Sequence, residues 1–334
     1  MLKKDLGLFI LILVVGAIVA LINPRFLSPI NLSNTANLIG LFGIFSLGEG
    51  MVIITGGIDL SIGSVFALLG VIFVDLLVSY QLPWPLAVLI ILAAGTLIGL
   101  INGFLITRMR LQPFVVTLCG LLLYRGIARY YTNDGTAGFE FGQSFPTLEW
   151  LTTGRSFGVP HSFAAFVIVA VAMSVLLHRS VFGRYLFAVG RNEEAARYSG
   201  IPSGQVVAAA YVICGALAGL SSIFLTMYTR SISPASHGNF YELYGIAAAV
   251  LGGCSLRGGE GSIVGIVLGA ILLQILQNLV NLLGIPSSLN FAVMGGVILI
   301  GVLADQQLKA YREFKAASRD SEGAMAKKPS LLAK

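Results

Sequence analysis

Long apolar stretches alternate with short polar segments along most of the chain. A membrane-spanning helix needs about 20 consecutive, mostly apolar residues. Ten stretches match this template, near residues 6–22, 38–56, 60–80, 85–105, 113–131, 162–178, 206–228, 242–256, 262–284 and 288–304. The pattern therefore predicts an all-α, polytopic membrane protein with about ten transmembrane helices.

Two places in this pattern leave alternatives open. The second and third stretches are separated only by Gly56-Gly57-Ile58-Asp59, which forms either a tight turn or a break in a helix inside the membrane. The eighth stretch is short and interrupted by glycine, so it is either a span or a re-entrant segment.

The composition excludes an ordinary soluble domain. Of the 334 residues, 56% are hydrophobic and only 11% are charged, whereas soluble domains carry about 25% charged residues. The 40 glycines fit helices that pack closely in a membrane, where small residues let backbones approach. Cys119, Cys214 and Cys254 match no metal or disulfide spacing, and we interpret them as small buried side chains.

The distribution of Lys and Arg predicts the orientation. If the N-terminus is inside and ten spans follow, most basic residues fall inside: Lys3, Lys4, Arg108, Arg110, Arg179, Arg184, Arg191, Arg197, Arg257 and the basic tail. Only Arg25, Arg155 and Arg230 fall in outside segments. Cytoplasmic segments of membrane proteins are enriched in Lys and Arg, so both termini are predicted to be cytoplasmic. The net charge of +6 follows from this bias, and we expect no nucleic-acid partner.

The ends of the chain divide into a membrane domain and a tail. The first apolar run, Leu6 to Ile22, is a retained helix or a cleaved signal peptide. We favour the helix, because no small-x-small cleavage site follows the run. The transmembrane domain is predicted to cover 1–304, and 305–334 to form a cytoplasmic tail that is partly disordered.

A polar, helix-prone segment lies between the sixth and seventh stretches, in a loop of about 179–205. Charged side chains at the bilayer centre cost about 2.5–3.5 kcal/mol each, so this loop must lie in water. Gly190 is predicted to break an amphipathic entry segment, Asn192 to cap a helix over 193–198, and Gly200 to stop it, with Pro202 after it. This helix is either a solvated connection or a docking site for another protein.

Asp59 lies in the glycine-rich break, where backbone groups released from the helix need partners. Its carboxylate is predicted to accept hydrogen bonds from the amides of Leu60, Ser61 and Ile62 and so to cap the next helix. Arg125 and Arg129 lie four residues apart on one helix face. We expect them to snorkel to the interface; the alternative is contact with acidic groups of the outer loop or of a partner.

No pattern of nucleotide binding or catalysis is found. The sequence contains no G-x-x-x-x-G-K-[ST] loop, so any ATP must be used by a partner. No nucleophile–base pair, clustered acid pair or metal set occurs, which argues against an enzyme.

Several motifs together resemble one family. Glu194-Ala195-Ala196, followed by Gly200, resembles the coupling loop of ABC importer permeases. Residues 56–64, Gly-Gly-Ile-Asp-Leu-Ser-Ile-Gly-Ser, resemble the signature after the second span in ribose/xylose/galactose-type sugar permeases. Leu251-Gly252-Gly253 with 258–262, and the segment from Gly120 to Gly126, resemble later motifs of that family in the same order. The outer loop, 132–161, shows no such pattern.

The resemblance implies a type II ABC importer-like permease fold in a bacterial cytoplasmic (inner) membrane. It implies two permease subunits of identical or related chains, cytoplasmic ABC ATPases that use ATP and Mg, and a periplasmic or extracellular solute-binding protein. This chain would bind no cofactor or metal itself. The residues implied to contact the ATPase are Glu193, Glu194, Ala195, Ala196, Arg197 and Gly200.

A pathway for a monosaccharide needs neutral donors and acceptors and one or two aromatic rings. The residues that fit this chemistry, or lie at the helix break, are Gly56, Gly57, Asp59, Ser61, Asn239, Tyr241, Tyr244 and Asn278. The alternative for Asn278 is a hydrogen bond between neighbouring helices. The alternative substrates are a signalling sugar, a branched-chain amino acid or a nucleoside. A secondary transporter is the other alternative, and it would depend on Glu49 or Asp75 as a titratable residue in the pathway.

Overall fold

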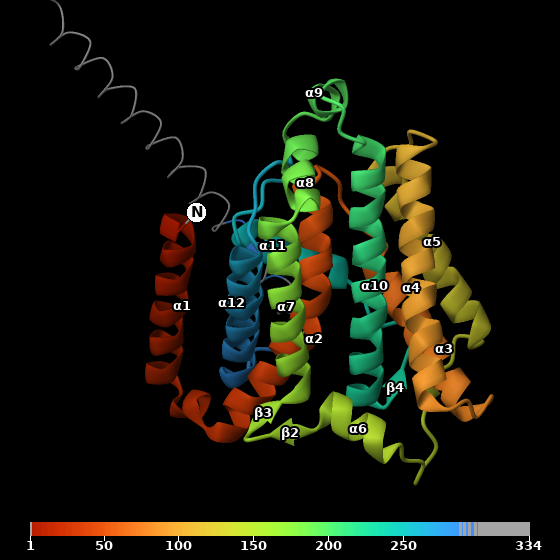
Figure 1. Cartoon of the computed structure of the whole chain (residues 1–334). Helices are drawn as coiled ribbons and strands as arrows, with labels where there is room; N and C mark the ends of the chain where they lie inside the picture. The colour runs from red at the N-terminus through yellow and green to blue at the C-terminus, as the bar shows by residue number, and fades with distance from the viewer. Residues whose placement is uncertain (1, 287–288, 290–291, 293–294, 297–298, 300–334) are drawn as a thin grey trace, which may run out of the picture. The chain divides into compact units, whose positions relative to one another are not determined.

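The computed structural model describes residues 2–286, 289, 292, 295, 296 and 299 (Figure 1). The chain divides into two units, 1–285 and 286–334. In the second unit the described residues 289, 292, 295, 296 and 299 are helical. The predicted tenth span, 288–304, lies largely outside the described residues, and the predicted tail, 305–334, lies wholly outside them.

The first unit is built almost entirely of helices. In chain order they are α1 (Leu2–Ile22), the 3-10 helix η1 (Pro24–Leu27), α2 (Pro29–Ile54), α3 (Ile62–Val78), α4 (Trp84–Thr107), α5 (Pro113–Tyr131), α6 (Pro146–Thr153), α7 (His161–Arg179), α8 (Val181–Arg191), α9 (Glu193–Tyr198), α10 (Ser203–Thr229), α11 (Tyr241–Leu251) and α12 (Ile263–Leu282). The strands are two residues long: β1 (Ala137–Gly138) pairs with β4 (Ser231–Ile232), and β2 (Arg155–Ser156) pairs with β3 (Val159–Pro160).

The all-α class predicted from the sequence is confirmed. Within the described residues, six helices are long and apolar enough to cross a membrane: α1, α2, α4, α7, α10 and α12. Two shorter apolar helices are α3 and α11, and α5 has 19 residues with arginines in its second half. These nine helices coincide with the first nine predicted spans.

Two predicted boundaries are wrong. α2 begins at Pro29 rather than near residue 38, because the Ser28 hydroxyl accepts a hydrogen bond from Asn31 N at 3.3 Å and starts the helix within the polar stretch. α11 has 11 residues rather than the 15 predicted for 242–256. At 1.5 Å per residue it is about 16 Å long, roughly half the hydrocarbon thickness, so it cannot cross the membrane by itself.

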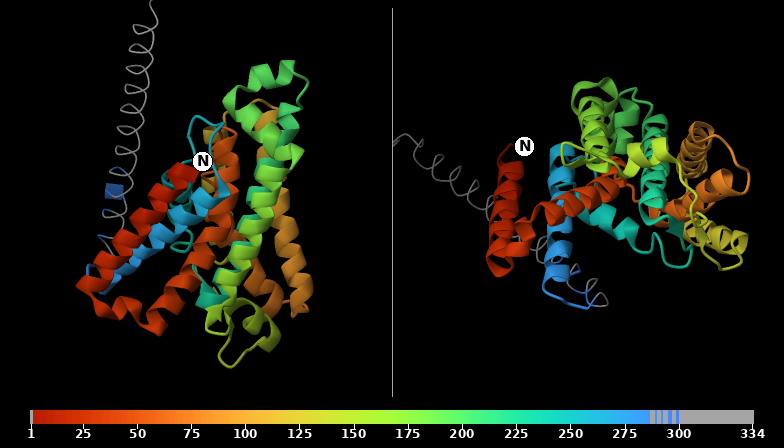
Figure 2. Two further views of the ribbon diagram at one scale, coloured as in Figure 1. Left: turned by 60° about the vertical axis from the view of Figure 1, so that its left-hand side comes forward. Right: turned by 90° about the horizontal axis from the view of Figure 1, so that it is seen from below.

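α2 is the central helix of the unit. In its most apolar window 89% of residues are buried, compared with 11% for α1. α7, α10, α11 and α12 all pack against α2, while α1 contacts mainly α12. Figure 2 shows α1 at the edge of the unit beside α12.

α4 and α10 form the most extensive helix pair, and glycine lets them approach closely. A Cβ atom at Gly99 of α4 would clash with Tyr211 O of α10 and would lie 2.9 Å from the Val212 Cα. The two helices run in opposite directions, since Gly95 contacts Gly215 and Gly103 contacts Ala208. The prediction that glycines serve close helix packing is therefore confirmed at this pair.

The unit has two ends that carry different elements (Figure 1). We call them the α9 end and the α6 end. At the α9 end lie α8, α9 and the loop of residues 252–262, and at the α6 end lie α6 and the β2–β3 hairpin. The hairpin is fixed to the start of α2, because Arg155 Nη2 donates to Asn34 Oδ1 at 3.1 Å.

Candidate functional site

The polar segment after α7 begins with an amphipathic helix, α8. The Ser180 hydroxyl accepts a hydrogen bond from Gly183 N at 3.1 Å and starts the helix. Gly183, Leu186 and Val189 form its buried face. α8 continues through Gly190 and ends at Arg191, so the predicted break at Gly190 is wrong. Because Gly190 has no side chain, the α8 backbone lies directly against the backbone of Ile54 and Gly259 at this position.

Asn192 separates α8 from α9 and caps α9. It is extended, and its Oδ1 accepts a hydrogen bond from Ala195 N at 2.9 Å. Glu193 and Glu194 follow in the first turn, where the partial positive charge of a helix N-terminus favours carboxylates. The predicted N-cap and its acidic pair are confirmed.

Gly200 ends the segment as the sequence indicates. Its φ of +80° is a left-handed conformation that glycine adopts without a steric cost. Gly200 N donates to Arg197 O, and Ile201 N donates to Ala196 O, both at 3.0 Å, so carbonyls at the helix end have partners. α9 is therefore a short helix with a defined start and end.

α9 presents most of its surface to solvent at one end of the unit (Figure 1). Among the residues predicted to contact a partner, Ala196 is buried, with 5% of its surface exposed. The others are exposed: Glu193, Glu194, Ala195, Arg197 and Gly200. A protein that docks on α9 would meet this exposed face, while Ala196 holds the helix against the rest of the chain.

The segment between α2 and α3 is a non-helical connection whose centre is buried. Gly57, Asp59 and Ser61 are buried, whereas Gly56 is exposed. Ile58 O accepts hydrogen bonds from the Tyr211 hydroxyl of α10 at 3.2 Å and from the Thr117 hydroxyl of α5 at 3.3 Å. The connection is therefore anchored to two other helices.

Asp59 organises the start of α3. Its Oδ1 accepts hydrogen bonds from Ser61 N at 2.9 Å and from the Ser61 hydroxyl at 2.6 Å. Asn102 Nδ2 of α4 donates to the same hydroxyl at 3.2 Å. The prediction is confirmed for the Ser61 amide, but no hydrogen bond to Asp59 from the amides of Leu60 or Ile62 is found in the described part of the chain, because α3 begins after Ser61.

Glu49 of α2 lies beside Asp59 and is fully buried. Its Oε1 accepts a hydrogen bond from Asp59 N at 3.1 Å. Among the described residues, its Oε2 has no hydrogen-bond partner. Glu49 therefore fixes the connection from the α2 side through a single oxygen.

An aromatic cluster joins α2, α3 and α11. Tyr241 and Tyr244 of α11 pack against Phe42 and Phe45 of α2 and Phe66 of α3. The ring centroid of Tyr241 lies 4.9 Å from that of Phe42 and 5.6 Å from that of Phe66. These two tyrosines were predicted as pathway residues, and the structure brings them together with three phenylalanines.

The side chains of the two predicted asparagines form hydrogen bonds with other parts of the chain. Asn239 is exposed, and its Nδ2 donates to Ala235 O at 2.9 Å. Asn278 of α12 forms a reciprocal amide pair with Asn31 of α2, with N–O distances of 3.0 and 2.8 Å. The amide of Asn278 is thus engaged in the alternative role, a hydrogen bond between helices.

Comparison with known proteins identifies the family. Residues 31–302 match the family described as the branched-chain amino acid transport system / permease component. The ribose import permease protein RbsC of Escherichia coli (strain K12) is 39% identical over 298 residues, which cover 89% of this chain and 92% of that protein. RbsC of Bacillus subtilis (strain 168) is 39% identical over 305 residues, covering 91% of this chain and 92% of that protein. The fructose import permease protein FruF of Bifidobacterium longum is 33% identical over 257 residues, covering 77% and 72%. The chain belongs to this permease family. No solved structure matches it.

Membership in the permease family agrees with the class predicted from the residues and from the resemblance. The chain is a multi-pass membrane protein, and its relatives are transport subunits. The aromatic partners Phe42, Phe45 and Phe66 were missed, because phenylalanine in an apolar span gives no signal that separates a pathway from ordinary packing.

In this permease, both arginines of α5 donate hydrogen bonds to loops elsewhere in the chain. Arg125 Nη1 donates to Pro234 O at 2.7 Å and to His237 O at 2.6 Å, so the expected snorkelling is wrong for this residue. The loop before α11 needs donors for its free carbonyls, and Arg125 supplies them. Arg129 pairs with Asp134 at 2.5 Å, which is the predicted alternative of contact with the outer loop.

A second ion pair lies at the α6 end. Arg230 Nη1 lies 2.7 Å from Glu149 Oε1, and the two side chains are 44% and 28% exposed. The hydrogen bond donated by Arg230 lowers the pKa of Glu149, and this effect outweighs the opposing effect of partial burial. These groups border a small hollow of about 250 Å³ that Arg155 also lines.

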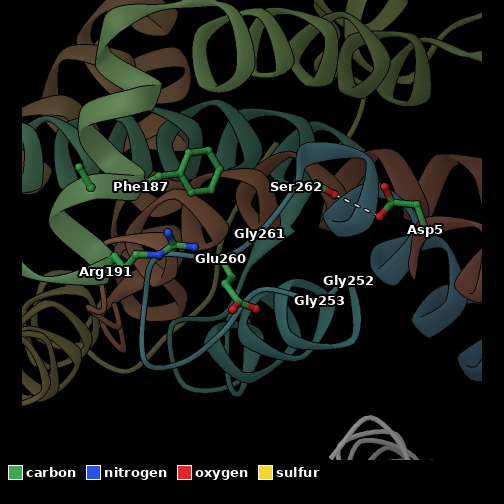
Figure 3. A pocket seen from close by; sticks show the side chains of 10 residues that line it. Asp5, Phe187, Arg191, Gly252, Gly253, Glu260, Gly261 and Ser262 are labelled. Carbon is green, nitrogen blue, oxygen red and sulfur yellow. Dashed lines mark hydrogen bonds between the residues drawn. The ribbon is translucent and has the colours of Figure 1, made fainter. Parts of the chain in front are cut away.

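A larger cavity, of about 560 Å³, lies beside α8 at the α9 end (Figure 3). Phe187 and Arg191 reach it from α8, and Asp5 borders it from α1, with the Ser262 hydroxyl donating to Asp5 Oδ1 at 3.3 Å. The loop of residues 252–262 forms much of its remaining wall. Within the described residues, no group of three or more His, Cys, Asp or Glu side chains is placed to hold a metal ion.

Proposed function

We propose that this chain is the transmembrane permease subunit of an ATP-driven ABC importer for a monosaccharide of the ribose, xylose or galactose kind. The observation that carries the proposal is the 39% identity to ribose import permeases over about nine-tenths of the chain. The exposed α9, capped at both ends and bearing the Glu194-Ala195-Ala196 motif, supports it from the structure.

The partner that hydrolyses ATP docks on the exposed face of α9. Glu193, Glu194, Ala195, Arg197 and Gly200 contact the cytoplasmic ATPase, and ATP and Mg are bound by that partner rather than by this chain. ATP binding draws two ATPases together and displaces α9. The displacement changes the packing of the helices and opens the pathway alternately to the two sides. The chain itself breaks no bond and needs no cofactor.

The α9 end faces the cytoplasm. Arg184, Arg191 and Arg197 belong to α8 and α9, whereas Arg155 and Arg230 belong to the α6 end. This split follows the enrichment of basic residues on the cytoplasmic side. With residues 1–304 as the membrane domain, both termini are cytoplasmic.

The aromatic cluster supports a sugar rather than an amino acid. A sugar ring has apolar C–H faces that pack on aromatic rings, and its hydroxyls need neutral donors and acceptors. Tyr241 and Tyr244 each provide an aromatic ring and a neutral hydroxyl, beside the rings of Phe42 and Phe66. An amino acid would need a partner for its carboxylate, and Arg125 already donates to two backbone carbonyls.

Two further partners complete the transporter. A second permease subunit, identical or related, provides the other half of the pathway. A periplasmic or extracellular solute-binding protein delivers the sugar to the α6 end, where Arg155, Arg230 and Glu149 border the small hollow. Exposed charges of this kind orient a partner and speed its approach more than they add to affinity.

Uptake by proteoliposomes containing the chain, its ATPase and its binding protein tests the substrate. We expect labelled ribose, xylose or galactose to accumulate. Leucine and a nucleoside serve as controls for the alternative substrates, and a signalling sugar is tested in the same series. Accumulation of leucine with no accumulation of any monosaccharide would refute the sugar assignment.

A further inference from the structure

Three chain segments meet through backbone contacts with no side chain between them: the end of α2 with Gly56 after it, the end of α8, and the loop after α11. We call this the glycine junction and define it as Gly56, Gly190, Gly258 and Gly259. A Cβ atom at Gly190 would clash with Ile54 O and would lie 2.5 Å from Gly259 N. A Cβ atom at Gly258 would lie 2.6 Å from Gly190 O. Each segment therefore fills the space that a side chain on its neighbour would need.

A hydrogen bond joins two of these segments. Gly259 N donates to Ile54 O at 2.8 Å, which ties the loop after α11 to the last residue of α2. Gly258 has a φ of +83°, a left-handed conformation that brings its backbone toward both partners. A Cβ atom at Gly258 would lie only 2.8 Å from Gly56 N. The contact is close, directional and free of flexible side chains, so displacement of one segment presses directly on the others.

The junction lies between the coupling helix and the buried connection. On one side, Gly190 is near the end of α8, and only Asn192 stands between α8 and α9. On the other side, Ile54 is followed by the short connection to Asp59. That connection is held at Ile58 by the Tyr211 and Thr117 hydroxyls. A displacement of α9 thus has a short path of packed backbone to the start of α3.

The path continues from α3 to the aromatic cluster. A Cβ atom at Gly63, in the first turn of α3, would clash with Gly238 O and with the Glu242 carboxylate, so α3 bears directly on the start of α11. The ring of Tyr241, beside Glu242, packs edge-to-face against the ring of Phe66 of α3. The segment that moves with the junction is therefore in contact with the residues proposed to line the pathway.

We propose that Gly190 is a positioning residue that transmits ATPase-driven displacement of α8–α9 to residues 54–61. This inference rests on the proposed function, and it adds the contact through which the motor acts on the pathway. The junction does not bind the ATPase, because Gly190 packs against the backbone of Ile54 and Gly259 rather than lying on the exposed face of α9.

The Gly190→Ala substitution tests the inference in the assembled transporter. The matched control is Gly204→Ala, near the start of α10, where the nearest atom to an added Cβ is the Thr107 Cβ at an ordinary 3.5 Å. Both changes replace a helical glycine by a better helix former. We expect Gly190→Ala to bind the ATPase and hydrolyse ATP while transported sugar per ATP falls about 2- to 30-fold. Gly204→Ala should keep the wild-type ratio.

Two results would overturn the inference. One is a folded, assembled Gly190→Ala transporter with an unchanged ratio of sugar to ATP. The other is a folded variant that no longer binds the ATPase, which would assign Gly190 to docking. If the wild-type chain itself bound no ATPase, the proposed function would fail, and that outcome is distinguishable from the first two.

Hydrogen exchange on the wild-type complex provides a second measurement that does not depend on the variant folding. A non-hydrolysable ATP analogue should change the exchange of peptides covering α9 and 54–61 together, while a peptide from α1 stays unchanged. A response in α9 with no response in 54–61 would contradict transmission through the junction. Exchange reports local opening and so reads a change of backbone contacts directly.

Discussion

Replacing Asp59 with alanine is the sharpest test of the buried connection between α2 and α3. Asp59 is 3% exposed, and its Oδ1 accepts from both Ser61 N and the Ser61 hydroxyl. Alanine leaves both donors without this acceptor in a buried site. Each unsatisfied buried donor costs about 1–3 kcal/mol, so the variant should lose about 2–6 kcal/mol of stability.

Asparagine at the same position separates hydrogen bonding from charge. Asp59→Asn retains an oxygen that can accept from Ser61, so we expect it to lose about 1 kcal/mol, the charge-assisted part of the bonds. Ser46→Ala is the control for a buried polar group. Within the described part of the chain, the Ser46 hydroxyl bonds only to Phe42 O of its own helix, at 2.7 Å. The expected order of stability is wild type and Ser46→Ala, then Asp59→Asn, then Asp59→Ala.

Thermal unfolding in detergent and sugar uptake at matched protein levels measure the effect. In soluble domains of about 150–250 residues, 1 kcal/mol shifts the unfolding midpoint by roughly 2–4 °C, so Asp59→Ala should unfold several degrees below wild type. Its uptake should fall as well, since the start of α3 loses its anchor. Normal membrane levels, an unchanged midpoint and full uptake in Asp59→Ala would show that Asp59 does not anchor the start of α3.

The cap of α9, the close contact between α4 and α10, and the Arg230–Glu149 pair each have a measurable consequence. Asn192→Ala removes the cap of α9 and should weaken that helix by about 0.5–2 kcal/mol; ATPase pull-down should show reduced binding, and undiminished binding would contradict this role. Gly99→Val forces a side chain against Tyr211 O, so folded yield on size-exclusion chromatography should fall sharply, whereas a normal yield would mean that α4 and α10 tolerate separation. Because Arg230 lowers the pKa of Glu149 from its usual 4.5, the ionised carboxylate stabilises the fold fully above pH 4.5. That contribution is lost as the pH falls through the lowered pKa, and Glu149→Gln should remove this pH dependence; an exposed pair is worth about 0–1 kcal/mol, so the titration should be small.

The helices and the ends of α9 were predictable from the sequence, because they depend on residues that are close together along the chain. The apolar runs located nine helices, because only helices satisfy backbone groups in lipid. Asn192 and Gly200 marked the limits of α9, since an N-cap side chain and a left-handed glycine are determined by residue type.

The role of a residue was not predictable from the sequence when it depends on a partner far away along the chain. Gly190 suggested a helix break, yet it lies inside α8, because its missing side chain serves a close approach to Ile54 rather than flexibility. Arg125 suggested a snorkelling side chain, but its partners are carbonyls of a loop more than a hundred residues away. Asn278 suggested a polar group for substrate, and its amide is paired with Asn31. None of these partners is visible from spacing along the chain.

Sugar uptake into proteoliposomes with and without the ATPase subunits distinguishes an ATP-driven importer from a secondary transporter. We expect a monosaccharide to accumulate against its gradient only when the ATPase, its binding protein and ATP are all present. We also expect Glu194→Lys to abolish accumulation while the chain remains folded in the membrane. Accumulation at the wild-type rate with the ATPase omitted, driven by an ion gradient, would instead identify a secondary transporter.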